Sequence, residues 1–129
     1  MSDASTSAPS PLARPDYIDD GCNFSFTIPA SQEPGRVHGE LSGSFRPCYG
    51  IDRERLIDAR DSMAKYCEVV IAAMPKYINS WSLTDRSGKA VPVTSAALER
   101  LHPALRDKLS NVVFFDFQEQ VEEQLKNLP

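Results

Sequence analysis

The side chains with the clearest capacity for metal or redox chemistry are two histidines, His38 and His102, and three cysteines, Cys22, Cys48 and Cys67. Metal sites in proteins draw their ligands from short, recurring spacings of such residues. Neither histidine lies at such a spacing from the other or from a cysteine. We therefore expect a surface role for His38, a helix-capping role for His102, and no metal or other cofactor. An odd number of cysteines without paired spacing favours free structural thiols in a reducing compartment.

Paired carboxylates are the other candidates for chemistry, because two such groups can divide general acid and general base work between them. Asp58 with Asp61, and Glu122 with Glu123, form such pairs. Both pairs fall on the polar faces of expected helices, which favours solvated charge over catalysis. The Gly-Lys dipeptide at 88–89 lacks the earlier glycine and the following Ser or Thr of a phosphate-binding loop. The sequence therefore predicts a protein that is not an enzyme.

Composition limits the classes of partner. The chain has 129 residues, a formal net charge of −4 and a pI near 5.1, and it contains no run of Lys or Arg. Nucleic-acid binding needs a concentrated basic face, so we expect no nucleic-acid partner. The longest uncharged apolar run, at 69–75, is far shorter than the ~20 residues of a membrane span. We expect one small domain that does not enter a membrane.

The elements expected around these side chains form an α+β fold. We predict an N-terminal antiparallel β-hairpin packed on a long helix, followed by a β-corner and two C-terminal helices. Residues 1–20 are rich in Ser, Ala, Pro and Asp and predict a flexible arm. If the arm becomes ordered on a partner, Tyr17 and Ile18 are its expected anchors. Residues 21–113 form the expected domain, and residues 114–129 a helical C-terminal extension.

The hairpin is predicted from alternation of apolar and polar residues. Phe24, Phe26 and Ile28 alternate with polar residues, as in a half-buried strand. A second, longer strand is expected over 37–45, with its apolar face thinned by glycines. Glycine inside a strand is typical of a bulge or of close backbone approach. An isolated hairpin is marginal in water, so a helix or another strand must cover it.

The long helix is predicted to begin after Asp52 as its N-cap. Pro75 falls inside its pattern and must either kink the helix or begin a new one. An apolar stripe at spacings of three, four or seven residues is expected to face the sheet. It comprises Leu56, Met63, Cys67, Val70, Met74, Ile78 and Trp81.

The corner that follows has four residues with expected structural roles. Trp81 closes the apolar stripe, and Gly88 is expected to take a positive φ in a compact turn. Thr94 is expected to cap a short helix, with an apolar pair around the cap. Pro103 fits the first position of the final helix.

The final helix could extend for about 25 residues, or roughly 37 Å. Its last part carries apolar residues at spacings of three and four, in a short heptad-like pattern. No later sequence is left to cover this seam, so we expect it to face a partner. The partner-facing residues are Phe114, Phe117, Val121, Leu125 and Leu128.

The corner also resembles a pattern in small proteins of tailed bacteriophages and prophages. There a "SW-L-D--G--VP-T" corner precedes two helices, and an upstream strand ending in Arg-Pro leads into the long helix. The matching residues are Gly43 to Pro47, Trp81 to Thr94, Leu98, Leu101, Pro103, Leu105 and Leu109. The likeness extends over roughly 40–113, whereas 114–129 departs from the short acidic or glycine-containing end that is usual there.

This resemblance implies a part in tail assembly, because several such proteins are tail assembly chaperones or tail-associated accessories. We expect a non-enzymatic factor that keeps the tape measure protein soluble in the host cell cytoplasm. The alternative is a structural component of the virion, such as a tail, neck or capsid-associated subunit. The expected partners are other phage proteins or further copies of the same chain. A small enzyme or host-directed regulator would need a convergent polar pocket, and the sequence indicates no residues that would build one.

Overall fold

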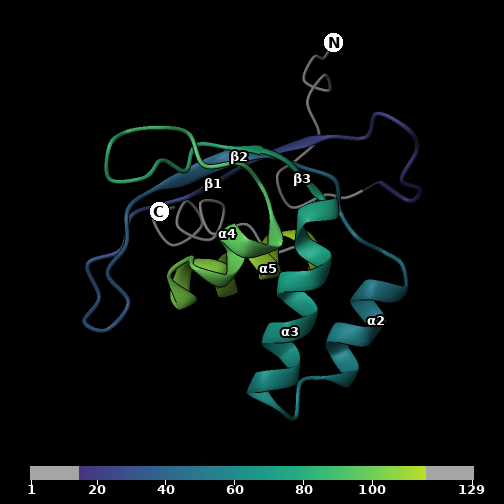
Figure 1. Ribbon diagram of the computed structural model, residues 1–129. Helices are drawn as coiled ribbons and strands as arrows, with labels where there is room; N and C mark the ends of the chain where they lie inside the picture. Colours follow the sequence, from purple (N-terminus) through teal and green to yellow (C-terminus); the bar gives the residue numbers. More distant parts are fainter. Residues whose placement is uncertain (1–14, 116–129) are drawn as a thin grey trace, which may run out of the picture.

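The computed structural model describes residues 15–115, and these form an α+β fold as predicted. Three antiparallel strands lie in the order β1-β2-β3, with bounds Phe24–Ile28, Leu41–Phe45 and Ile78–Trp81. The α-helices are α2 (Ile51–Asp58), α3 (Met63–Ala73), α4 (Ser95–Glu99) and α5 (Pro103–Phe115), and a 3-10 turn, η1, covers Met74–Lys76. Figure 1 shows the sheet across the top of the molecule and the helices beneath one of its faces. No described helix is long and apolar enough to cross a bilayer.

The predicted hairpin is confirmed. β1 and β2 pair in the register Phe26↔Gly43 and Ile28↔Leu41. The apolar residues of each strand face the helices, as period-two alternation requires. The core between sheet and helices includes Phe26, Ile28, Leu41, Phe45, Leu56, Val70, Met74, Ile78, Leu98, Leu105, Leu109, Val112 and Val113.

Gly43 marks a close backbone approach, as glycine inside a strand predicts. A Cβ built there would lie 2.8 Å from the Cα of Trp81 and closer still to the Ser80 carbonyl oxygen. The register of β2 with β3 also shifts between Ser44 and Phe45. Only glycine allows the two strands to meet at this point, because any Cβ would collide with main-chain atoms.

The outer face of the sheet carries hydroxyl and amide side chains. Ser44 and Ser80 lie opposite each other with their Oγ atoms 2.8 Å apart, and Ser42 N donates to Ser82 Oγ at 3.0 Å. Next to them, Asn79 Nδ2 donates to Asn23 Oδ1. Lateral hydrogen bonds between neighbouring segments therefore link the side chains of this face.

The single long helix predicted over 52–81 is wrong. The chain folds instead into α2 and α3, which lie side by side in Figure 1. Between them Ser62 caps α3, its side chain accepting from Lys65 N at 3.3 Å. The expected cap of the first helix is also displaced, because Gly50 occupies the N-cap position and Asp52 lies buried in the first turn. Met63, expected inside the apolar stripe, is 77% exposed at the start of α3.

The end of the predicted stripe is a strand. Pro75 lies in η1, where the α-helix ends. Because its ring removes a backbone donor, it favours termination here over a kink. Ile78 and Trp81 then belong to β3. The third strand supplies the cover that the predicted hairpin needed on one of its edges.

The longer second strand predicted over 37–45 is also shortened. Residues 41–45 form β2, while Ser31 and His38 form an isolated bridge before it. The expected alternation is inverted at its start, because Val37 is 51% exposed and His38 only 9% exposed. Burial of this ring is tolerated because both of its nitrogens have protein partners, the Gly39 carbonyl oxygen and Lys108 Nζ.

The predicted corner and the two predicted helices after it are confirmed. Gly88 has φ +85° in the turn that joins Thr84 to Ala90 in an isolated bridge. Thr94 caps α4 by accepting from Ala97 N at 3.1 Å. Pro103 is the first residue of α5. This helix passes the predicted domain boundary at 113/114 without a break and is described as far as Phe115.

Candidate protein-binding site

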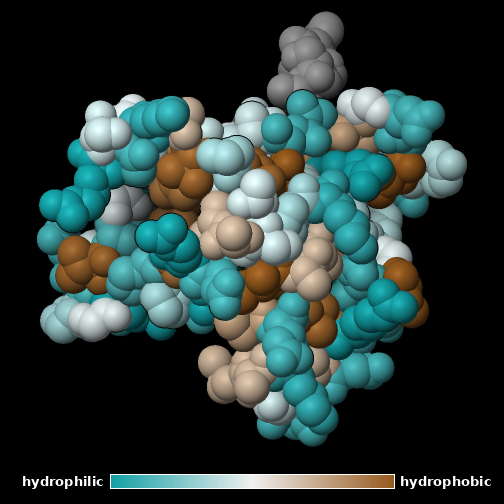
Figure 2. Space-filling model, in the orientation of Figure 1, coloured by the Kyte–Doolittle hydropathy of each residue, from teal (hydrophilic) through white to brown (hydrophobic). Residues whose placement is uncertain are grey.

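A cavity of about 590 Å³ lies between the loop at 37–39, the corner at 83–92, α4 and the start of α5. We call it the corner pocket. Its volume is typical of sites that bind a small molecule or a few side chains of a partner. In Figure 2 apolar and weakly polar surface gathers between the corner loop and the helices below it. The lining residues are Val37, His38, Gly39, Leu83, Thr84, Asp85, Val91, Pro92, Thr94, Ala96, Ala97, Arg100, Leu101, His102 and Leu105.

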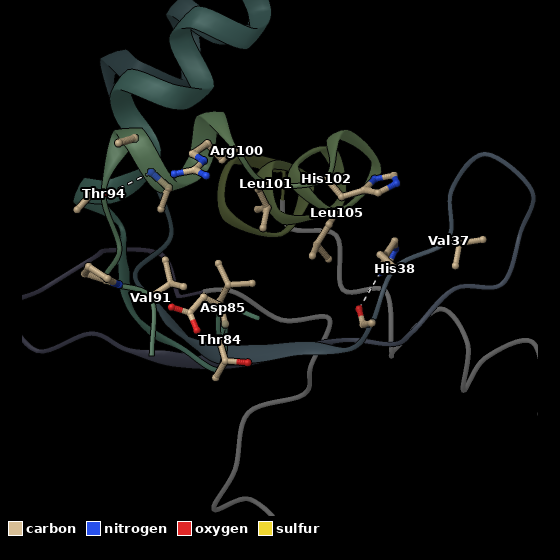
Figure 3. Close-up of a pocket in the computed structure, with 15 residues that line it drawn as sticks. Val37, His38, Thr84, Asp85, Val91, Thr94, Arg100, Leu101, His102 and Leu105 are labelled. Carbon is tan, nitrogen blue, oxygen red and sulfur yellow. Dashed lines mark hydrogen bonds between the residues drawn. The ribbon is translucent and has the colours of Figure 1, made fainter. Parts of the chain in front are cut away.

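The walls of the corner pocket are mainly aliphatic. Leu101 and Leu105 are 6% and 5% exposed, and they point from the helices towards the corner in Figure 3. Val91 and Leu83, both half-buried, contribute from the corner itself. Such walls favour apolar groups, which lose contact with water on entering.

Hydrogen bonds hold the corner side of the pocket in place. Trp81 Nε1 donates to the Val91 carbonyl oxygen at 2.6 Å, and Val91 N donates to the Leu83 carbonyl oxygen at 3.0 Å. Trp81 is half-buried and packs against the core. Trp81 belongs to β3 and does not close a helical stripe, and its ring fixes a segment that lines the pocket.

The two histidines meet at one end of the pocket, with ring centroids 6.0 Å apart. His38 Nδ1 lies 2.8 Å from the Gly39 carbonyl oxygen, and Lys108 Nζ lies 3.0 Å from His38 Nε2. Both contacts are satisfied when Nδ1 carries the proton and Nε2 accepts from the ammonium group. An ammonium group on Nε2 leaves that nitrogen no lone pair for a metal. Because His38 is buried, the surface role predicted for it is wrong.

His102 caps the final helix, as predicted. Its Nδ1 accepts from Ala104 N at 3.1 Å, in the first turn of α5. This bond satisfies one of the free amide groups of the helix terminus. Nδ1 is thereby occupied, and the only proton of a neutral ring lies on Nε2, a donor at the rim of the pocket. No group of three or more His, Cys, Asp or Glu within 15–115 is arranged to hold a metal ion.

Opposite charges mark the other end. Arg100, the residue that follows α4, and Asp85 of the corner both line the corner pocket. Asp85 Oδ1 accepts from Ser87 Oγ at 2.7 Å and from the amides of Ser87 and Lys89 at 2.9 and 3.0 Å. These hydrogen bonds, that of the Ser87 hydroxyl first, hold the pKa of Asp85 below its usual value. The carboxylate therefore stabilises its own turn.

A second polar cluster lies at the other side of the helices, around the carboxylate of Asp52. Its side chain is 7% exposed, and its Oδ2 accepts from Tyr77 Oη at 2.8 Å and from Lys76 Nζ at 3.2 Å. Arg55 donates to Oδ1 at 3.4 Å. We call these four residues the Asp52 cluster. Asp52, Arg55 and Lys76 border a cavity of about 250 Å³, half the size of the corner pocket or less.

The Asp52 cluster perturbs two pKa values. The hydrogen bond from Tyr77 is the largest influence on Asp52, and with Lys76 and Arg55 it lowers the pKa of the carboxyl against the opposing effect of burial. Burial, followed by hydrogen bonds with Cys48 and Asp52, raises the pKa of the Tyr77 hydroxyl. Each shift favours the form that the hydrogen bond needs, an ionised Asp52 and a protonated Tyr77. The cluster joins α2 to the segment after α3.

The other side chains considered for chemistry are dispersed. Asp58 and Asp61 are both exposed, at the end of α2 and in the following turn. All three cysteines are free thiols. Glu122 and Glu123 lie outside the described residues.

The predicted partner-facing residues have different outcomes. Phe114 is 2% exposed and its ring packs edge-on against Tyr77, with centroids 5.8 Å apart. The prediction that it faces a partner is therefore wrong, because α5 turns it into the core. Tyr17 is 77% exposed and Ile18 is half-buried, near the point where Tyr49 Oη donates to the Pro15 carbonyl oxygen at 2.6 Å. Phe117, Val121, Leu125 and Leu128 lie outside the described residues.

The sequence did not indicate the corner pocket. Four residues of this region, at 81, 88, 94 and 103, were predicted to have structural roles, whereas 83–105 lines most of the cavity. One signal was present in the sequence, because the short segment at 83–92 carries three apolar residues, Leu83, Val91 and Pro92. The remaining wall, at 37–39, comes from a loop distant in the sequence.

The chain matches no protein-family model, no curated protein and no solved structure.

Proposed function

We propose that this protein is a non-enzymatic protein-binding factor of a tailed bacteriophage, which acts in the host cell cytoplasm as a tail assembly chaperone for the tape measure protein. The corner pocket is the proposed site, and apolar side chains of the client are its occupants. The observation that carries the proposal is the aliphatic lining of a cavity walled by the same corner, 81–94, that resembles tail-associated proteins.

The geometry supports binding of a protein segment in two ways. The pocket is lined by four separate segments and remains open at the surface, so a chain can lie across it. Its polar groups lie at the ends, with Arg100 and Asp85 at one and the histidines at the other. A client segment with apolar anchors between polar residues fits this distribution.

Co-expression with the tape measure protein tests the proposal. We expect wild-type protein to raise the soluble fraction of the client and to co-purify with it. Ala97 lines the pocket from α4, and an Ala97→Glu variant would place a charge against aliphatic walls. We expect that variant to bind the client at least tenfold more weakly, or about 1.4 kcal/mol.

Ala64→Glu is the matched control, because Ala64 is an exposed residue of α3 outside the pocket lining. It should bind the client as the wild type does. If the wild type neither co-purifies with the tape measure protein nor changes its solubility, the chaperone proposal is wrong. If Ala97→Glu binds normally, the corner pocket is not the site.

Mass spectrometry of purified particles separates this proposal from a structural role. A chaperone is expected to be absent from the mature particle. A tail, neck or capsid-associated subunit would be present in many copies, and that result would replace the chaperone by the virion component.

A further inference from the structure

The free edge of β1 is a second surface with a defined geometry. β1 is the outermost strand of the sheet, and within 15–115 it pairs only with β2. Ser25 is exposed and Thr27 half-buried. An unpaired strand edge presents a row of backbone donors and acceptors that another strand can use.

Backbone alternation identifies the residues that face this edge. Ser42 turns both of its backbone groups away from β1, because its N donates to Ser82 Oγ and its carbonyl oxygen accepts from Ser82 N at 2.8 Å. Its neighbour Gly43 therefore faces β1 and pairs with Phe26. It follows that the N–H and C=O groups of Ser25 and Thr27 point outwards, along the free edge.

This edge lacks the charged residues that usually guard such strands. Natural edge strands are protected by lysines, inward charges, prolines or bulges. Residues 21–32 contain no charged side chain and form the longest uncharged run of a chain that is 25% charged. Pro29 lies just beyond the strand, so the four outward groups of Ser25 and Thr27 remain available.

We propose that β1 pairs antiparallel with β1 of a second copy of this chain, about a two-fold axis at Phe26, to form a continuous six-stranded sheet. Ser25 then faces Thr27 of the other copy in a hydrogen-bonded pair, and each Phe26 faces its symmetry mate. This register keeps every apolar residue on the helix side and every hydroxyl on the outer side. The proposal is independent of the chaperone function.

The strand itself favours a second copy over a different partner. A two-fold axis places the strand against itself, so any charge within it would meet a like charge close by. β1 is neutral throughout, and this symmetry pairs hydroxyl residues with hydroxyl residues and apolar residues with apolar residues. One pair of short strands buries less area than a standard stable interface, so we expect a weak, reversible dimer.

Sedimentation equilibrium of the full chain tests the proposal. Between about 5 μM and about 500 μM, the average mass should rise from 14.3 kDa towards twice that value. Hydrogen exchange at the Ser25 and Thr27 amides should slow in parallel. A mass of 14.3 kDa at every concentration would overturn the proposal.

The Thr27→Pro variant tests the interface itself. Proline removes an outward N–H and leaves the ladder with β2 intact, so circular dichroism and thermal unfolding should stay close to wild type. We expect the dimer dissociation constant to rise at least tenfold. Thr27→Ala keeps the amide and should dimerise normally.

Two results contradict the assignment to β1. One is a Thr27→Pro protein that folds and dimerises as the wild type does. The other is protection of the Ser25 and Thr27 amides only after the tape measure protein is added, with the free chain monomeric, because the edge would then receive a client strand. If Thr27→Pro fails to fold, exchange at these two amides in the wild type decides between dimer and monomer.

Discussion

The corner pocket and the Asp52 cluster differ in the direction of their polar groups. Asp52 is nearly buried, and the hydroxyl, ammonium and guanidinium around it all point at its two carboxylate oxygens. At the corner pocket the centre is aliphatic, and polar side chains lie at the two ends. The polar atoms of the Asp52 cluster bind one another, whereas the corner pocket exposes an apolar surface on which a ligand could be bound.

This difference shows that a concentration of charge in this fold can be explained by structure alone. Two groups of the Asp52 cluster have shifted pKa values, but the geometry of the cluster is explained by the need to satisfy a buried carboxylate. The corner pocket would need no shifted group for its proposed role, because burial of surface would bind an apolar client. Mutations should therefore separate the two regions by stability and by binding.

The largest expected effect on stability is that of Asp52→Ala. The change leaves the Tyr77 hydroxyl without its acceptor and removes the anchor between α2 and the segment after α3. We expect unfolding free energy to fall by about 2 kcal/mol, near the lower end for such groups because Lys76 and Arg55 reach solvent. Urea unfolding measures the loss.

Asp58→Ala is the control, because Asp58 is exposed on the same helix. It should change stability by no more than about 0.5 kcal/mol. If Asp52→Ala and Asp58→Ala lower the unfolding free energy equally, the Asp52 cluster adds no stability beyond that of an acidic residue on the helix. Loss of client binding by a folded Asp52→Ala protein would contradict the division between the two regions.

The pH dependence of stability gives a second test of the Asp52 cluster. The pKa of Asp52 lies below its ordinary value of 3.8, so the folded state binds this proton less readily than the unfolded state. The stabilisation is present above the unfolded pKa and is lost as pH falls through the folded pKa. Urea unfolding between about pH 6 and pH 2.5 should therefore show a steeper acid decline in the wild type than in Asp52→Asn. Parallel curves would contradict the assignment.

The sequence predicted the parts of this fold that depend on local chemistry. Alternating Phe24, Phe26 and Ile28 indicated a strand, and the cap at Thr94 and the proline at 103 indicated helix starts. Each signal acts within a few residues, where steric limits and capping bonds dominate. Glycine inside the second strand also predicted a close backbone approach or a bulge, although its neighbour there, β3, was not predicted.

Predictions failed where two local patterns competed. Residues 56–81 fit a helical stripe, but Ser62 is also a good cap and Pro75 a good terminator. Pairing of 78–81 with β2 decided the outcome, and such pairing depends on residues more than thirty positions away. The prediction for Phe114 was wrong for a similar reason, because its ring packs against Tyr77, which belongs to a distant segment.

The candidate site was the least predictable part. Its walls join 37–39 to 83–105, and no periodicity within either segment indicates that they meet. His38 shows the difficulty, because alternation placed it outside the fold, whereas Lys108 and Gly39 hold it inside. A pocket of this kind follows from tertiary packing, which overrides strand alternation at its edges.

The smallest expected effect, that of Thr94→Ala, tests whether the corner pocket depends on local capping. Thr94 Oγ1 accepts from Ala97 N, and both residues line the pocket. Loss of the cap should reduce unfolding free energy by about 1 kcal/mol and weaken client binding, because the first turn of α4 frays at the pocket wall. Thr94→Ser keeps the oxygen and should restore both properties. A loss of stability without any change in client binding would show that core packing of α4 alone holds the pocket wall. The corner pocket and the Asp52 cluster would then differ in the polarity of their side chains and not in how firmly their backbone is held.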